Sequence, residues 1–349
     1  MRAVVMREFG DEDVLRLEDV PDPSPGPSQV LVRVVAVEVS RTRDIATRTG
    51  RHPFSAFVTL PRILGGDFGG VIEAVGAGVD PGLIGRRVAV SNTETCGECE
   101  ECLAGHEERC LQLTLLGIHR DGSYAELATV AAGNAHRVPD DLPLSEAAAL
   151  AADGSIAFTQ LKVAGVGPGT KLLVTGVTGA LGSTLAALGA HLGAEVIGLS
   201  RRPGEVSPGL PLSHNLDAAD PELTDRLLAA TDGEGIAAVA DNVAAPDAFA
   251  KYFAALAVGA CVVFSGAIGN PELPVLPVPA GPLYVKSISL LGVRTTTPAD
   301  RRRLWELVDA GFRLPLGSIA EMPLEEAAAA HALIRRGGQH GHTILTVGS

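Results

Sequence analysis

A glycine-punctuated segment between two apolar runs constrains the fold of this chain more than any other feature. Residues 171–202 read "KLLVTGVTGALGSTLAALGAHLGAEVIGLSRR", and three glycines spaced three apart separate the first apolar run from a helical pattern of small residues. Glycines at this spacing let the backbone turn tightly and approach a pyrophosphate, whose charge the helix N-terminus stabilises. A bare glycine triplet also suits an ordinary strand-to-helix turn, but the second apolar run at the expected distance favours a dinucleotide site. The residues predicted to contact the dinucleotide are Gly176, Thr178, Gly179, Ala180, Leu181 and Gly182.

The pattern around this segment predicts a doubly wound parallel sheet. Apolar, β-type runs recur at residues 171–175, 195–199, 236–240 and 260–264, with mostly helical patterns between them. Residues 1–150 differ, because short β-rich runs such as 29–39 alternate there with Pro/Gly turns such as 21–28. The fold class is therefore α/β: a β-rich domain over residues 1–150, a nucleotide-binding domain over 151–290, and a return to mixed structure over 291–349.

Two helices are expected in the last segment. They are "PADRRRLWELVDAG" (298–311) and "PLEEAAAAHALIRRG" (323–337), each with a proline near its first turn. The run Arg301–Arg303 in the first of these helices is expected to form a solvated face.

Composition excludes several classes of partner. Lys and Arg number 28 against 41 Asp and Glu, a net charge of −13 that disfavours nucleic acid and anionic membranes. No apolar run approaches the roughly 18 residues of a membrane span, and the start of the chain lacks the pattern of a signal peptide. A soluble, cytoplasmic protein acting on a small molecule is expected.

The end of the second apolar run bears on the choice of cofactor. An NAD site usually has an acidic residue there, whereas this chain has Ser200, Arg201 and Arg202. Two guanidinium groups suit a 2′-phosphate, so NADPH is favoured. The alternative without a role in cofactor binding is a solvated basic turn.

Four of the five cysteines are clustered in "CGECEECLAGHEERC" (96–110). The spacing C-x2-C-x2-C-x7-C of Cys96, Cys99, Cys102 and Cys110 is typical of a metal site, because four thiolates close a tetrahedral shell. A redox pair or two disulfides are the rivals, and a reducing compartment disfavours disulfides. Cys261 lies in the apolar run "GACVVFSG" and is expected to be a buried strand cysteine.

Together these segments resemble the medium-chain dehydrogenase/reductase superfamily, which includes zinc alcohol dehydrogenases and zinc-free quinone oxidoreductases. The resemblance runs through "LGGDFGGVIEAVGAGV" (64–79), the cysteine cluster, "GIHRDGSYAELATV" (117–130), the glycine segment, "ADNVA" (240–244) and "GHTILTV" (341–347). It implies a GroES-like substrate domain built from both chain ends, a Rossmann domain between them, and a cleft where they meet. It also implies one structural Zn²⁺ on the four cysteines, a homodimer joined through residues 285–293, and contacts of Asn242, Gly266 and Ala267 with the nicotinamide side of the cofactor.

The chain departs from the alcohol dehydrogenase pattern at the catalytic zinc. The ligand positions fall on Ser40 or Arg41, depending on where a one-residue insertion is placed, on Gly66 followed by Asp67, and on Ala152. These residues cannot jointly replace thiolate and imidazole, so we expect no catalytic zinc, and the alternative that stays open is a metal site built from unrelated residues such as His52, Asp67 and Asp153. Without a Lewis acid, hydride transfer to a conjugated carbonyl is easier than to an isolated one, because the charge spreads into an enolate.

The resulting prediction is an NADPH-dependent quinone or enone reductase, in which Ser40, Arg41 and Asp67 are the candidate catalytic residues. Each of the three has a non-catalytic alternative: Ser40 fills space, Arg41 faces solvent, and Asp67 caps or orients the backbone. Two other functions stay open. They are a zinc-independent aldehyde or ketone reductase and a catalytically idle nucleotide-binding protein.

Overall fold

The computed structural model describes residues 1–266, 275–337 and 340–348, and the chain divides into two compact units. The first comprises Met1–Asp153, Thr297–Arg313 and Ile319–Ser349, and the second comprises Gly154–Thr296 and Leu314–Ser318. The changes expected at 150/151 and 290/291 compare with observed unit boundaries at 153/154 and 296/297. Both ends of the chain therefore contribute to one unit.

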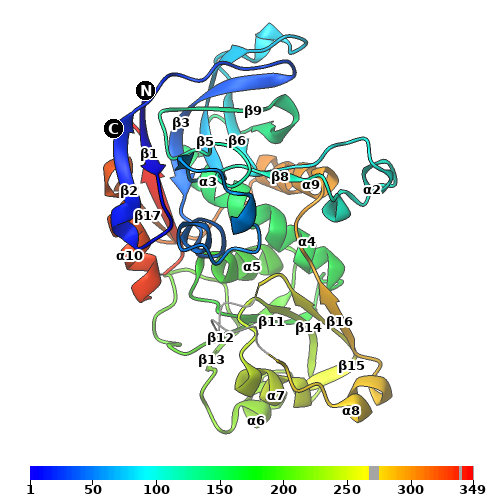
Figure 1. Ribbon diagram of the computed structural model, residues 1–349. Coiled ribbons are helices and arrows are strands. Elements are labelled where there is room, and N and C mark those ends of the chain that lie inside the picture. Colours follow the sequence, from blue (N-terminus) through cyan, green and yellow to red (C-terminus); the bar gives the residue numbers. More distant parts are fainter. Residues whose placement is uncertain (267–274, 338–339, 349) are drawn as a thin grey trace. The chain divides into compact units, whose positions relative to one another are not determined.

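A seven-stranded sheet organises the first unit (Figure 1). Its path is β10-β6-β5-β3-β18-β17, and β9 also pairs with β3. The neighbours are antiparallel except for the β17–β18 pair, which is parallel. The strands are β3 Gln29–Glu38, β5 Phe68–Val75, β6 Arg87–Val90, β9 Leu127–Ala131, β10 Ala135–Arg137, β17 Ile319–Pro323 and β18 His342–Thr346.

Two smaller sheets complete the strands of this unit. One has the order β2-β1-β4 and the other pairs β7 with β8. Their bounds are β1 Arg2–Met6, β2 Leu15–Asp19, β4 Arg62–Ile63, β7 Thr93–Glu94 and β8 Thr114–Leu115. Alternating buried residues of β3, such as Val30, Val32 and Val34, join those of β1, β5 and β9 in one apolar core.

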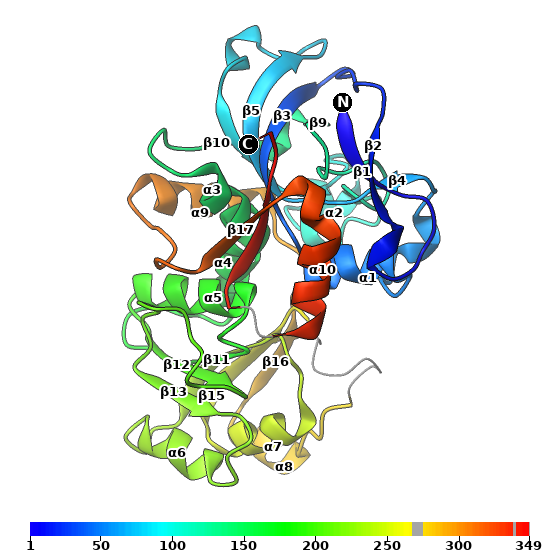
Figure 2. The same ribbon diagram turned by 90° about the vertical axis from the view of Figure 1, so that its left-hand side faces the viewer.

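Helices cover parts of this unit. Figure 2 shows α10 beside β17, with which it is in contact. The helices are α1 Ala46–Arg48, α2 Glu100–Leu103, α3 Leu144–Ala149, α9 Pro298–Asp309 and α10 Ala327–Arg336. Two π-helical turns, Arg41–Ile45 and Leu150–Gly154, lie next to α1 and α3.

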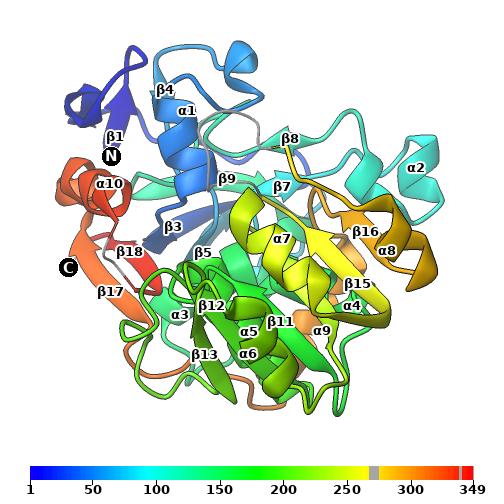
Figure 3. The same ribbon diagram turned by 90° about the horizontal axis from the view of Figure 1, so that it is seen from below.

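The second unit is built on a six-stranded, all-parallel sheet of order β13-β12-β11-β14-β15-β16. Figure 1 labels these strands, and Figure 3 shows β13, β12, β11, β15 and β16 from below. The strands are β11 Lys171–Thr175, β12 Glu195–Ser200, β13 His214–Asp217, β14 Ile236–Asp241, β15 Leu256–Phe264 and β16 Ser289–Gly292. Numbered from β11, this is the order 3-2-1-4-5-6 of a doubly wound dinucleotide fold. The order reverses between β11 and β14, where ligands of such sheets bind.

Helices pack on both faces of the parallel sheet (Figures 1 and 2). One face carries α4 Ser155–Val163 against α5 Ala180–His191, and the other carries α6 Leu223–Ala229 against α7 Pro246–Ala254. A short helix, α8 Ala280–Val285, precedes β16. Phe249, Tyr252 and Phe253 of α7 are buried in the core of this unit.

The predicted fold class, a GroES-like β-rich domain plus a Rossmann-type parallel sheet, is confirmed. The four runs predicted as parallel strands all belong to that sheet, although β15 begins four residues earlier than expected, at Leu256. Among the described residues, no helix has both the length and the apolar character needed to cross a membrane. The "RRR" prediction is wrong for its first residue, because Arg301 is buried whereas Arg302 and Arg303 are exposed.

Candidate functional site

The glycine segment forms the loop between β11 and α5 in the second unit. Gly176 has a φ of +63°, a conformation that L side chains rarely adopt. A Cβ at Gly182 would lie 2.2 Å from the carbonyl oxygen of Gly176, so only glycine fits where the helix starts against the loop. The N-cap is Gly179, so the first N–H groups of α5 point out of the sheet's carboxyl edge. Since α5 has twelve residues and starts at the point where the strand order reverses, the loop fits a dinucleotide pyrophosphate.

The predicted basic turn follows β12. Ser200 is buried and its hydroxyl accepts a hydrogen bond from the backbone N–H of Arg202 at 3.3 Å. Arg202 forms an ion pair of 3.0 Å with Glu205. Arg201 is exposed, and its side chain has no ion pair with the part of the chain that the structure describes. Arg201 is therefore the guanidinium that is free to contact a ligand.

Asn242 lies at the end of β14 in a closed ring of three side chains. Its amide nitrogen donates to Gln160 Oε1 at 3.2 Å, Gln160 Nε2 donates to Ser265 Oγ at 2.7 Å, and Ser265 Oγ donates to Asn242 Oδ1 at 2.6 Å. Gly266 follows Ser265 at the same carboxyl edge of the sheet, where a Cβ would lie 3.4 Å from Asn242 O. Ala267 lies outside the described residues.

The four clustered cysteines converge in a separate lobe of the first unit. Their Sγ atoms all lie within 4.8 Å of one another, with 3.8 Å between Cys96 and Cys102 and 3.6 Å between Cys96 and Cys110. A zinc ion at about 2.3 Å from four sulfurs separates them by about 3.8 Å. The sulfurs therefore fit one tetrahedral Zn²⁺ with no position open for substrate.

A π-helical turn accounts for the insertion that the sequence left unplaced. Within Arg41–Ile45, the N–H of Ile45 donates to Ser40 O five residues back at 3.2 Å, so the turn accommodates one extra residue. Ser40 caps this turn, and its Oγ accepts from the N–H of Arg43 at 3.3 Å. Arg41 is exposed, and its guanidinium donates to the carbonyl of Ile334.

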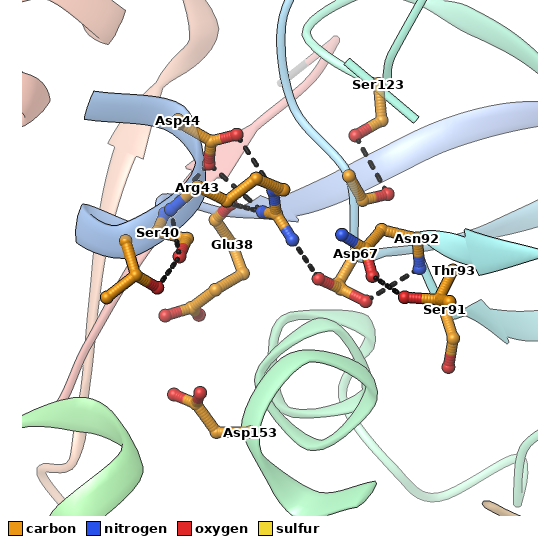
Figure 4. Close-up of polar contacts among 12 residues, drawn as sticks. Glu38, Ser40, Arg43, Asp44, Asp67, Ser91, Asn92, Thr93, Ser123 and Asp153 are labelled. Atoms are coloured by element: carbon orange, nitrogen blue, oxygen red, sulfur yellow. Dashed lines mark hydrogen bonds and ion pairs between the residues drawn. The ribbon is translucent and has the colours of Figure 1, made fainter. Parts of the chain in front are cut away.

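Arg43 fills the centre of the first unit's polar site (Figure 4). Its Nε and Nη2 donate to Asp44 at 2.9 and 3.1 Å, and its Nη1 forms an ion pair with Asp67. Burial lowers the pKa of Arg43, but the carboxylates of Asp44 and Asp67 outweigh this effect and raise it well above its usual value. The other oxygen of Asp67 accepts from the N–H of Asn92 at 2.8 Å, so this carboxylate is held on both sides.

The position of Arg43 explains the glycine at residue 66. A Cβ at Gly66 would lie 2.7 Å from both Cζ and Nη1 of Arg43 and 2.6 Å from the Cβ of Asn92. Real Cβ atoms essentially never approach other atoms so closely. The guanidinium therefore lies where a side chain at residue 66 would begin.

A second polar cluster joins β3, β18 and the π-helical turn before α4. Glu38 Oε1 lies 3.2 Å from His342 Nδ1, which lies 3.6 Å from Asp153 Oδ2. Glu38 and His342 are 3% and 0% exposed, whereas Asp153 is 20% exposed. The carboxyl groups of Glu38 and Asp153 face each other in Figure 4.

Burial dominates the acidity of this cluster. It raises the pKa of Asp153 to about 7 against the opposing effect of His342, and the nearby carboxylates of Glu38 and Asp67 add to the rise. Burial likewise raises the pKa of Glu38. Burial alone would lower the pKa of His342, but the carboxylates of Glu38 and Asp153 raise it.

The residues that dominate the first unit's site are not among those predicted from the sequence. Arg43, Glu38 and His342 are fully or almost fully buried and charged or polar. Glu38 had one visible signal, because an acidic residue interrupts an otherwise apolar run, "VVAVEV". His342 had none, since its partner is 304 residues away in the chain.

Comparison with known proteins agrees with the fold and the cysteine lobe. The alcohol dehydrogenase GroES-like domain matches residues 26–140, and the zinc-binding dehydrogenase domain matches residues 180–310. The chain is similar to a crystal structure of an NAD-dependent alcohol dehydrogenase, with 30% sequence identity and a TM-score of 0.89. The match covers 100% of both chains. The chain belongs to the medium-chain dehydrogenase/reductase superfamily.

Curated relatives are matched to different extents. The NAD-dependent alcohol dehydrogenase of Sulfolobus acidocaldarius is 29% identical over 99% of this chain and 100% of its own length. An L-threonine 3-dehydrogenase of Anaeromyxobacter dehalogenans (strain 2CP-C) is 34% identical over 56% of this chain and 55% of its own length. The chain thus spans only about half the length of some curated relatives that it matches at higher identity.

Proposed function

We propose that this protein is an NADPH-dependent oxidoreductase that reduces a conjugated carbonyl compound, a quinone or an enone, without a catalytic zinc. The observation that carries the proposal is the guanidinium of Arg43 beside Gly66. An imidazole at residue 66 has no room there, and a divalent cation next to a buried guanidinium would be repelled. With no thiolate among residues 40, 66 and 152, the position offers no soft ligand.

Without a catalytic zinc as Lewis acid, the range of carbonyl compounds that can be reduced easily is narrower. An isolated ketone develops a localised alkoxide as hydride arrives, and that charge needs a metal or strong donors. A conjugated substrate spreads the charge into an enolate or hydroquinone anion, for which a single proton suffices. Arg43 cannot substitute as a general electrophile, because Asp44 and Asp67 already take most of its N–H groups.

Asp153 is the proton donor that we propose. It is the partly exposed member of the cluster with Glu38 and His342, and a pKa of about 7 keeps a proton available near neutral pH. As the partly exposed member, Asp153 would regain its proton from solvent, while His342 and Glu38 behind it hold the carboxyl group in place. Ser40 and Asp67 hold the Arg43 network in this scheme, and the predicted donor role of Arg41 remains a prediction for an exposed side chain.

NADPH is proposed as the cofactor, which when bound would supply the hydride. The loop of Gly176, Gly179 and Gly182 fits its pyrophosphate, and Arg201 is free to contact a 2′-phosphate. Such charge-assisted contacts contribute about 1.5–3 kcal/mol each, so Arg201→Ala should weaken NADPH about tenfold or more. NADH binding should be unchanged, and Arg303→Ala, at an exposed arginine of the other unit, is the control. Equal losses for both cofactors would contradict this assignment.

Assembly and location are part of the same proposal. Strand β16 is an edge of the parallel sheet, and exposed apolar side chains lie near it at Tyr284, Val285 and Leu291. An exposed edge of this kind is either covered or prone to aggregate, which supports a homodimer. We propose a cytoplasmic enzyme with one structural Zn²⁺ on the four cysteines, acting on a small molecule.

A substrate panel tests the function. Quinones, enones and saturated ketones are offered with NADPH and NADH to protein whose metal content is measured in parallel. Turnover of the conjugated compounds at one zinc per chain is expected. Preferential turnover of saturated ketones would favour an alcohol dehydrogenase-like function, as the names of two relatives suggest. NADPH binding with no turnover of any compound would favour an idle nucleotide-binding protein.

A further inference from the structure

The buried stripe of helix α9 contains an arginine. Arg301, Leu304, Trp305 and Val308 are all buried, at the spacing i, i+3, i+4 and i+7 that defines one helix face. Arg302 and Arg303, the next two residues, are exposed. The charge of Arg301 thus lies where the helix periodicity calls for an apolar side chain.

Within the residues that the structure describes, Arg301 has no ion-pair partner to compensate its burial. It is 1% exposed, and its Nε and Nη1 atoms form no hydrogen bond within the described part of the chain. Burial lowers the pKa of Arg301. Three carboxylates oppose this from a distance, without forming an ion pair with it: Asp67, Glu107 and Glu94. Arg303, by contrast, pairs with Glu306 at 2.6 Å. An isolated buried charge is costly unless something of opposite charge meets it.

Other donors near Arg301 are also unsatisfied. Trp305 lies one turn further along α9, and its Nε1 has no hydrogen-bond acceptor among the described residues. Its ring stacks on His136 of β10, with ring centroids 6.3 Å apart, and His136 Nε2 is likewise without a partner in the described chain. Burial, Arg301 and Arg302 lower the pKa of His136 to about 4, so the imidazole is neutral near pH 7.

The strand register places a hydroxyl on the same face. His136 pairs with Ala89 of β6, and Ser91 lies two residues beyond Ala89, so the side chains of all three point to one side of the sheet. Ser91 is 3% exposed, and its Oγ is unsatisfied within the described residues. Helix α9 thus contributes a guanidinium and an indole N–H. The sheet contributes an imidazole and a hydroxyl.

We infer that Arg301, Trp305, His136 and Ser91 bind an oxyanion, the carboxylate or phosphate group of an organic molecule. Guanidinium and indole nitrogens can only donate, so the complementary ligand must be rich in acceptors. The single positive charge of Arg301 matches a single negative charge. Ser91 directly precedes Asn92, whose N–H donates to Asp67 of the Arg43 site, so the anionic group of a substrate is the source that we favour over a free anion.

Trp305 provides a direct probe, because it is the only tryptophan of the chain. Cofactor-free, zinc-containing protein is titrated with inorganic phosphate and with acetate, at an ionic strength held constant with chloride. A saturable change of tryptophan fluorescence is expected. Arg301→Met should weaken binding about tenfold or more, since it removes a charge-assisted contact. Arg303→Met, two residues along the same helix, should bind as the unchanged protein does.

Further variants keep the inference testable if Arg301→Met does not fold. Arg301→Lys retains the charge and should retain part of the affinity, and Ser91→Ala should lose a smaller part of it. No saturable signal in the unchanged protein, or equal binding by folded Arg301→Met, would overturn the inference.

A second arm identifies the source of the anion and rests on the proposed function. An enone that carries a carboxylate is compared with its methyl ester. A lower KM for the acid that is lost in Arg301→Met, with kcat retained, is expected if the anion belongs to the substrate. Phosphate binding without that difference would show that the site takes a free anion instead. Failure of both enones to turn over would count against the proposed function and leave the fluorescence result standing.

Discussion

Replacing Arg43 by methionine tests how much its guanidinium contributes to the stability of the first unit, where it pairs with buried carboxylates. The substitution keeps much of the side-chain volume and removes the cation that pairs with Asp44 and Asp67, whose side chains are 1% and 6% exposed. Removing one partner of a buried ion pair costs about 3–5 kcal/mol of unfolding free energy. Asp44 keeps the N–H of Ser40 at 2.8 Å as a donor, and Asp67 keeps that of Asn92, so a loss within that range is expected.

The loss should depend on pH. Without the guanidinium, two carboxylates stay buried with no cation beside them, and a buried carboxylate costs more free energy than a neutral carboxylic acid. That cost is smaller at acidic pH than at alkaline pH. Arg43→Met should therefore lose less stability at about pH 5 than at about pH 8.

Urea unfolding at the two pH values is the measurement. The double variant Arg43→Met/Asp67→Asn should recover part of the loss, because a neutral amide replaces one unpaired charge. Arg41→Met, at the exposed arginine of the same turn, is the control and should change stability by about 0.5 kcal/mol or less. A loss for Arg43→Met below about 1 kcal/mol, independent of pH, would refute the idea that this pair neutralises the site.

Three further predictions follow from the glycine loop, the cysteines and the acidic cluster. Gly182→Ala should weaken NADPH binding about tenfold or more because its Cβ would meet a carbonyl 2.2 Å away, whereas Gly204→Ala, where nothing lies within 4 Å, should not; calorimetric titration measures both. Strong chelation, or Cys99→Ser, should lower the melting temperature, and activity should fall only as the fold is lost; activity lost at an unchanged melting temperature and restored by zinc would reveal a catalytic metal. Between about pH 4 and its pKa of about 7, folded Asp153 holds a proton that the unfolded chain releases, so stability falls as pH rises through this window. Asp153→Asn should flatten that fall in melting temperature, and an unchanged pH profile would contradict the raised pKa.

Local patterns were enough to predict four of the six strands of the second unit. The central strands β11, β12 and β14 are short apolar runs buried on both faces, and the glycine spacing is dictated by contacts within a few residues, such as Gly182 against Gly176. The cysteine spacing is equally local, since one lobe supplies all four sulfurs. In these cases the contacts that determine the structure are made by residues close together in the sequence.

Arg301 was mispredicted although its position could have been derived. The run of three arginines was interpreted by composition alone, as a solvated face. The helix period would have separated them, because Arg301 shares its phase with Leu304, Trp305 and Val308. What the period does not explain is why a charge occupies that stripe. An acceptor-rich ligand would explain it.

The acidic cluster could not be predicted, because its geometry arises from long-range register. Glu38 meets His342 only because β18 pairs with β3 at Ile344↔Glu38, which joins the two ends of the chain. Asp153 reaches them from a π-helical turn, where one extra residue shifts every later side chain around the helix axis. The same device, in Arg41–Ile45, belongs to the segment that brings Arg43 to Gly66.

Both π-helical turns thus lie in segments where the resemblance to alcohol dehydrogenases placed ligands that this chain lacks. A simple loss of ligands would leave a hole at residue 66 and unpaired groups around it. Instead, the turn at Arg41–Ile45 contains Arg43, whose guanidinium fills the space, and the turn at Leu150–Gly154 places a carboxyl group against an imidazole. Because each turn costs helical hydrogen bonds, their joint presence supports the proton-donating site that we propose.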